Sequence, residues 1–162
     1  MNINELFQMQ KALDTYIEKE HGLEEEDLFQ EKTLALLVEI GELANETRCF
    51  KFWSKKSPSE KDVILEEFVD GVHFILSLGI ALGIKNFKLR DASYKDASLT
   101  EQFLNVYHSI NDFTSKRSVT EYDQLVHQYF YLGESLGFSH EEVVQAYKQK
   151  NEVNYRRQEQ GY

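Results

Sequence analysis

Helical periodicity with few helix breakers limits this chain to one class of fold. Proline occurs once and glycine eight times in 162 residues, and no run alternates apolar and polar residues long enough to suggest a sheet. Apolar residues instead recur every three or four positions, so that one face of the first predicted helix carries Leu6, Met9, Leu13 and Ile17. The sequence therefore predicts an all-α fold.

Four serines mark predicted helix starts. Each is followed three residues later by glutamate, the spacing of a capping box; the pairs are Ser57/Glu60, Ser98/Glu101, Ser118/Glu121 and Ser139/Glu142. Pro58 would take the first helical position, which proline favours. We predict about six helices, at 4–21, 27–48, 58–83 and 99–115 and after Ser118 and Ser139, with Gly22 ending the first. Segment 85–97 is predicted to be a loop, and 1–162 a single domain, a compact helical bundle.

Composition excludes several classes of partner and location. The 28 acidic and 18 basic residues give a net charge of −10, which opposes binding to nucleic acid or anionic lipid. Cys49 is the single cysteine, so no intrachain disulfide can form. The first residues lack a signal-peptide pattern, and the most apolar stretch, 72–84, is too short to span a bilayer. We expect a cytoplasmic protein without a membrane span or a nucleic-acid partner.

Two acidic pairs lie on the two most apolar predicted helices. Glu39 and Glu42 fall on one narrow stripe of the second helix, and Glu67 and Asp70 repeat that spacing on the third. If these helices pack antiparallel, four carboxylates converge and need a cation between them. Oxygen ligands favour Mg²⁺, with Mn²⁺ as a substitute, and Mg²⁺ often also binds phosphates. The spacing predicts a metal site for phosphate chemistry in a four-helix core.

Two other interpretations of these acids are less favoured. An acid-rich chain produces E-x-x-E by chance on a solvated helix face, although two such pairs on two apolar helices argue against this. A di-iron bundle needs carboxylate-x-x-His motifs on two helices. Asp70-Gly-Val-His73 fits this motif, whereas the residues three positions before His108, His127 and His140 are Asn105, Gln124 and Gly137.

Two segments supply candidate ligand-binding groups. Residues 50–56, Phe-Lys-Phe-Trp-Ser-Lys-Lys, place Lys51 and Trp53 where they could touch a phosphate and stack on a base. Composition alone equally allows these rings to close a hydrophobic core. The last helix presents Tyr147, Lys150, Asn154 and Arg157 on one face. That face suits a phosphate chain, or it is a solvated helix end with basic residues favoured by the dipole.

These motifs together resemble a known family. Glu39-Ile-Gly-Glu42 and Glu67-Phe-Val-Asp70 look like the acidic pairs of all-α nucleoside triphosphate pyrophosphatases. With segments 36–45, 50–53, 67–74 and 150–162, the chain resembles the dimeric dUTPase family nearly end to end. The resemblance implies a homodimer that hydrolyses dUTP, and also dUDP, to dUMP with Mg²⁺ bound by Glu39, Glu42, Glu67 and Asp70.

The resemblance also implies roles for residues around the metal. Gln10 and Trp53 would belong to the uracil pocket, His73 would lie near the deoxyribose, and the phosphates would be faced by Lys150, Asn154 and Arg157. A water made more acidic by the metal would attack the β-phosphorus, and we predict that Glu39 accepts its proton. The chain is shorter than many members between His73 and the closing motif, so 85–140 has no assigned role.

Two alternatives remain open at this point. The same fold and metal site could serve another base, as in a MazG-like or dCTP-directed pyrophosphatase. A dimeric helical module could instead bind a partner protein through its acidic surface, without catalysis. The apolar circumference of the third helix independently favours a subunit interface.

Overall fold

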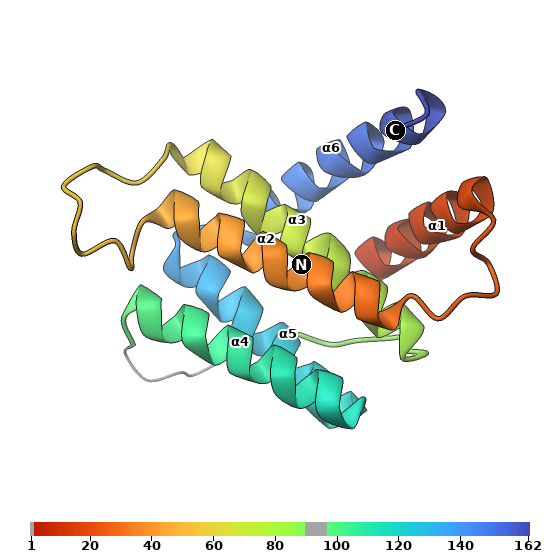
Figure 1. Cartoon of the computed structure of the whole chain (residues 1–162), viewed down its shortest axis with the longest axis horizontal. Coiled ribbons are helices and arrows are strands. Elements are labelled where there is room, and N and C mark those ends of the chain that lie inside the picture. Colours follow the sequence, from red (N-terminus) through yellow and green to blue (C-terminus); the bar gives the residue numbers. More distant parts are fainter. Residues whose placement is uncertain (1, 90–96) are drawn as a thin grey trace.

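The computed structural model describes residues 2–89 and 97–162, and within these ranges it contains helices and no strand (Figure 1). The helices are α1 (Ile3–His21), α2 (Phe29–Thr47), α3 (Lys61–Ala81), α4 (Leu99–Lys116), α5 (Val119–Ser135) and α6 (His140–Glu159). The prediction of six helices in an all-α fold is confirmed. Among the described residues, no helix combines the length and the apolar character needed to cross a membrane.

Local chemistry sets several of the helix ends as predicted. Ser98 and Ser139 form complete capping boxes with Glu101 and Glu142. At the start of α5 the Ser118 side chain accepts a hydrogen bond from the backbone N–H of Glu121. α1 ends at Gly22, which adopts a left-handed conformation with φ of 65°.

The predicted capping box at Ser57 is wrong. α3 begins at Lys61, and Glu60 precedes it without a side-chain capping bond, so Pro58 lies outside the helix. Ser59 is held instead by Glu46 at the end of α2. Its backbone N–H donates to the Glu46 carbonyl oxygen over 3.0 Å, and its hydroxyl donates to the Glu46 carboxylate. These tertiary hydrogen bonds keep the chain extended where the local sequence favours a helix.

α3 is the central helix of the structure. It runs beside α2 in the opposite direction and also contacts α1, α5 and α6 (Figure 1). Its apolar circumference is therefore covered within one chain, so it does not by itself indicate a subunit interface. Most of the 85–140 segment forms α4 and α5, which pack on α2 and α3. Part of the predicted 85–97 loop, residues 90–96, lies outside the described residues.

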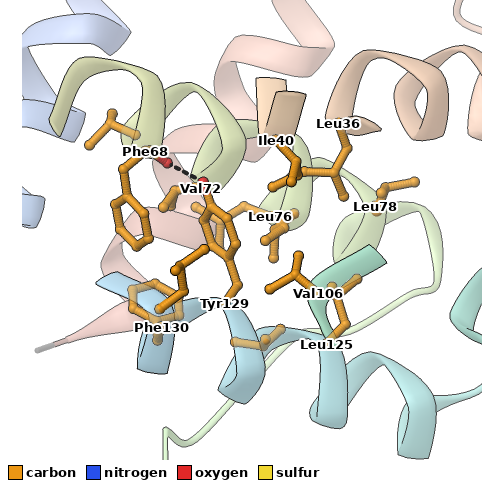
Figure 2. Close-up of a cluster of buried hydrophobic side chains, with 14 of the residues drawn as sticks. Leu36, Ile40, Phe68, Val72, Leu76, Leu78, Val106, Leu125, Tyr129 and Phe130 are labelled. Carbon is orange, nitrogen blue, oxygen red and sulfur yellow. Dashed lines mark hydrogen bonds between the residues drawn. The ribbon is translucent and has the colours of Figure 1, made fainter. Parts of the chain in front are cut away.

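Part of the core lies between α2, α3, α4 and α5 (Figure 2), and the core continues to buried residues of α1 and α6, such as Leu6 and Tyr147. The Tyr129 ring stacks on Phe68 with centroids 4.6 Å apart, and its hydroxyl donates to the Phe68 carbonyl oxygen over 2.8 Å. Tyr122 likewise donates to the carbonyl oxygen of Ile75 over 2.9 Å. Because buried hydroxyls are costly without partners, these bonds fix how α5 packs against α3.

Glycines let the tyrosines of α5 approach α3 closely. A Cβ atom added at Gly79 would lie 2.3 Å from the Tyr122 hydroxyl oxygen and 2.9 Å from a ring carbon of Phe7. We expect Gly79→Ala to lower the free energy of unfolding by about 1–3 kcal/mol, the usual cost of overpacking.

Gly41→Ala is the matched control for Gly79→Ala in urea denaturation at equal protein concentration. A Cβ at Gly41 would lie 3.4 Å from the nearest atom, which is an ordinary contact. Alanine has the higher helix propensity, so Gly41→Ala should raise the free energy of unfolding by up to about 1 kcal/mol. Equal stability of the two variants would contradict the packing account.

Candidate functional site

Three of the four predicted metal ligands converge. One carboxylate oxygen from each of Glu39, Glu67 and Asp70 lies within 4.8 Å of the others. Glu39 comes from α2, while Glu67 and Asp70 lie one turn apart on α3, so the antiparallel α2–α3 pair builds this acid trio. Glu42 is exposed and lies outside it. The trio involves only two helices, and the four-helix metal-binding core stays a prediction.

Burial and mutual repulsion make it costly to ionise the three carboxylates of the trio. Burial, followed by repulsion from Asp70, Glu42 and Glu67, raises the pKa of Glu39 from 4.5 to about 7. Burial is also the largest cause of the raised pKa values of Glu67 and Asp70. Crowded carboxylates of this kind are stabilised by a cation, and their hard oxygen atoms suit Mg²⁺ or Mn²⁺. The donor set therefore fits a divalent metal.

Lys150 supplies positive charge to this cluster from α6. Its Nζ lies 2.7 Å from Asp70 Oδ2 and 2.9 Å from Glu66 Oε1, and the side chain is only 12% exposed. The lysine lowers the pKa of both Asp70 and Glu39. In the metal-free protein, Lys150 therefore offsets part of the repulsion within the trio.

The raised pKa of Glu39 makes the stability of the metal-free protein depend on pH. Since the folded-state pKa of about 7 exceeds the ordinary value of 4.5, the folded protein holds this proton more tightly than the unfolded chain does. The resulting stabilisation is fully present below about pH 4.5 and is lost as the pH rises through about 7. We expect Glu39→Gln, measured in EDTA, to gain Tm relative to the unchanged protein across this window. A difference in Tm that does not change with pH would contradict the raised pKa of Glu39.

A pocket of about 270 Å³ opens beside the trio, between α1, α2, α3 and α6. It brings together side chains that are far apart in the sequence. The predicted site residues that line it are Gln10, Glu39, Asp70, His73, Lys150, Asn154 and Arg157. One cavity thus combines carboxylates, cations and hydrogen-bonding groups, which is the combination that a nucleotide with a bound metal requires.

Two predicted ligand-binding residues lie elsewhere on the chain. Lys51 and Trp53 belong to the α2–α3 loop, at the end of α2 away from the α1–α2 connection (Figure 1), and neither lines the pocket. Trp53 is 65% exposed and packs edge-on against Phe52, with ring centroids 5.0 Å apart. Lys51 donates a hydrogen bond to Asn45. Within one chain, these two residues are not part of the pocket.

The pocket is also lined by a polar network that the sequence patterns did not predict. Asp14 accepts hydrogen bonds from Gln10 Nε2 over 2.7 Å and from Ser77 Oγ over 2.5 Å. Lys32 Nζ lies 3.6 Å from its Oδ2 atom. Burial raises the pKa of Asp14, while Lys32 and the two hydrogen bonds act in the opposite direction. A serine inside the most apolar helix was the one available sequence signal.

Comparison with known proteins identifies the family. A family model described as dUTPase matches residues 2–162, whereas a search of curated proteins gives no match. The match includes both acidic pairs, the polar residues of the pocket and the closing segment, and it confirms the resemblance found from the motifs. The chain therefore belongs to the all-α dimeric dUTPase family, hydrolases that cleave a phosphoanhydride of dUTP.

Proposed function

We propose that the chain hydrolyses dUTP, and also dUDP, to dUMP in a Mg²⁺-dependent reaction in the pocket beside the acid trio. Family membership supports dUTP diphosphatase activity. The observation that carries the finer proposal is that Glu39 and Asp70 share one cavity with Lys150, Asn154 and Arg157. Mn²⁺ is expected to substitute for Mg²⁺, because both ions prefer oxygen ligands.

The acids are proposed to hold the metal and to accept a proton. Glu39, Glu67 and Asp70 would bind the ion, with Glu42 as the predicted fourth ligand. A divalent ion bound there supplies charge neutralisation for the phosphates and lowers the pKa of a bound water. Glu39 is the proposed proton acceptor, since burial and its acidic neighbours bring its pKa to about 7, which suits a base that works near neutral pH.

The remaining pocket residues are proposed to bind the nucleotide. Lys150, Asn154 and Arg157 lie on one face of α6 and offer two cations and an amide to the phosphates. Once the metal neutralises the trio, Lys150 would leave its ion pair with Asp70 and bind a phosphate oxygen instead. His73 is proposed to lie near the deoxyribose and Gln10 near the base, since both side chains line the pocket.

We also propose that the protein acts as a homodimer in the cytoplasm. α2 exposes Leu34 and Val38, which are 64% and 49% exposed one turn apart, and Leu104 on the adjacent α4 is 54% exposed. Such apolar surface is typical of a subunit interface. Phe52 and Trp53 are also exposed, so a second subunit offers Trp53 and Lys51 a route to a nucleotide that their own chain does not provide.

The dimer proposal predicts the effect of charge on the outer face of α2. We expect the double change Leu34→Lys, Val38→Lys to convert the dimer into monomers of 19.0 kDa, because like charges would face each other across the interface. Light scattering after size exclusion measures this mass. Val119→Lys, at an exposed position on α5, should leave the dimer intact. A monomeric unchanged protein, or a variant that still dimerises, would refute the proposed interface.

One assay tests the substrate and the metal together. Pyrophosphate release is measured with dUTP, dCTP, dTTP, dATP, dGTP and UTP, each with Mg²⁺ and with EDTA, and phosphate release is measured with dUDP. Mg²⁺-dependent release from dUTP and dUDP alone would support the proposal. Preference for another nucleotide would favour the MazG-like or dCTP-directed alternative, and no activity from folded protein would favour the non-catalytic module.

A further inference from the structure

The hydrogen bonds of Gln10 determine which nitrogen of His73 carries the proton. Gln10 Oε1 accepts a bond from the Tyr147 hydroxyl over 2.7 Å and lies 2.7 Å from His73 Nδ1. An amide oxygen can only accept, so Nδ1 must be the protonated nitrogen. The other nitrogen, Nε2, is buried without a partner. Leaving an acceptor there costs less than burying an unpartnered N–H, so both ends of the ring favour the same tautomer.

Asp14 is the group that keeps Gln10 in this orientation. Its Oδ1 accepts from Gln10 Nε2 over 2.7 Å, and a flipped amide would instead turn its oxygen toward the carboxylate. The other neighbours tolerate the flip. Tyr147 has a second acceptor in the Leu6 carbonyl oxygen at 3.4 Å, and neutral His73 can accept at Nδ1 from an amide N–H. Only the charge of Asp14 distinguishes strongly between the two orientations.

The fixed amide also limits what Gln10 can offer to a ligand. Its oxygen already serves Tyr147 and His73, and one of its two N–H groups serves Asp14. A single N–H donor remains on a residue that lines the pocket. Such a donor pairs with a carbonyl group and opposes an amino group. Uracil presents a carbonyl at the ring position where cytosine presents an amino group, so the remaining donor favours uracil.

We propose that Asp14 is a positioning residue which, through the Gln10 amide, sets the tautomer of His73 and makes the pocket select uracil over cytosine. The selection of the base rests on the proposed function, whereas the tautomer does not. Burial, followed by the charge of Lys150, lowers the pKa of His73 to about 3, so the ring is neutral near pH 7 and its tautomer is defined. Asp14→Asn keeps the shape of the side chain but allows it to face Gln10 with either an oxygen or an amide nitrogen.

The tautomer is tested without substrate. Long-range ¹H–¹⁵N correlation spectra of the ¹⁵N-labelled protein distinguish a protonated ring nitrogen from an unprotonated one, and His73→Gln identifies the His73 signals among those of the five histidines. We expect protonation at Nδ1 in the unchanged protein and a shift of the proton toward Nε2 in Asp14→Asn. Asp112→Asn makes the same change at an exposed position on α4 and should leave the tautomer unchanged. Protonation at Nε2 in the unchanged protein, or no change in Asp14→Asn, would overturn the positioning role.

The base selection is tested by the ratio of kcat/KM for dUTP to that for dCTP. Sites built around specific hydrogen bonds discriminate by about 10⁴-fold, so we expect Asp14→Asn to lower this ratio by at least about tenfold, whereas Asp112→Asn should stay close to the unchanged protein. A changed tautomer with an unchanged ratio would overturn the selection step alone. If the unchanged protein hydrolyses no nucleotide, the selection step fails with the proposed function, while the spectra still decide the role of Asp14.

Discussion

Glu39→Gln is expected to abolish turnover of dUTP while nucleotide binding stays measurable. Loss of a general base alone costs about 10²–10⁴-fold in rate, and this change also removes a proposed metal ligand, so kcat should fall to the lower limit of the assay. The amide has nearly the shape of the acid, and it removes a charge that burial and repulsion from the neighbouring acids disfavour at this position. The fold should therefore persist.

Single-turnover pyrophosphate release and equilibrium binding of a non-hydrolysable dUTP analogue separate these two effects. Glu46→Gln is the matched control, because Glu46 follows Glu39 by two turns of α2 but binds Ser59 instead of joining the trio. Its kcat should stay close to that of the unchanged protein. Normal turnover in Glu39→Gln would remove Glu39 from the mechanism.

Lys150→Met is expected to destabilise the metal-free protein by about 3 kcal/mol. Removing one partner of a buried ion pair costs about 3–5 kcal/mol, and the lower value applies because Lys150 and Asp70 are 12% and 18% exposed. The loss should be largest at alkaline pH, where the acids of the trio are all ionised. Mg²⁺ should restore most of it, since the ion supplies the missing positive charge.

Urea denaturation in EDTA and in excess Mg²⁺ measures this effect. Lys148→Met is the control on the same helix, because Lys148 pairs with Glu5 where both side chains are about half exposed, and such pairs contribute at most about 1 kcal/mol. If Lys150→Met is as stable as Lys148→Met in EDTA, Lys150 does not compensate the charge of the trio.

The sequence predicted features that depend on residues close together in the chain better than features that depend on residues far apart. The capping boxes at Ser98 and Ser139 depend on residues three positions apart, and both formed as predicted. The capping box predicted at Ser57 did not form, because Ser59 donates a hydrogen bond to Glu46, which lies 13 positions earlier in the chain. The outcome at each site followed from whether a distant partner competed with the local one.

The same distinction applies to the site. The spacing of the acids within each helix predicted that four carboxylates converge across an antiparallel pair. Glu39, Glu67 and Asp70 do so, whereas Glu42 is exposed and lies outside the trio. The bond between Asp14 and Ser77 joins residues that lie 63 positions apart. Ser77 stands out in an apolar helix, but nothing within either helix indicates which residue it bonds. The position of Trp53 depends on a loop, whose path periodicity does not describe.

The arrangement of the helices also bears on how the pocket opens. α1 and α6, from opposite ends of the chain, pack on each other and on α3, whereas α2, α4 and α5 pack together on its other sides. The pair of α1 and α6 is therefore suited to detach as one cooperative unit, at less cost than global unfolding. Detachment would open the pocket beside the acid trio and leave the residues labelled in Figure 2 packed between α2, α3, α4 and α5. Amide hydrogen exchange in α1 and α6 should then slow on ligand binding, while exchange in α5 stays limited by global unfolding.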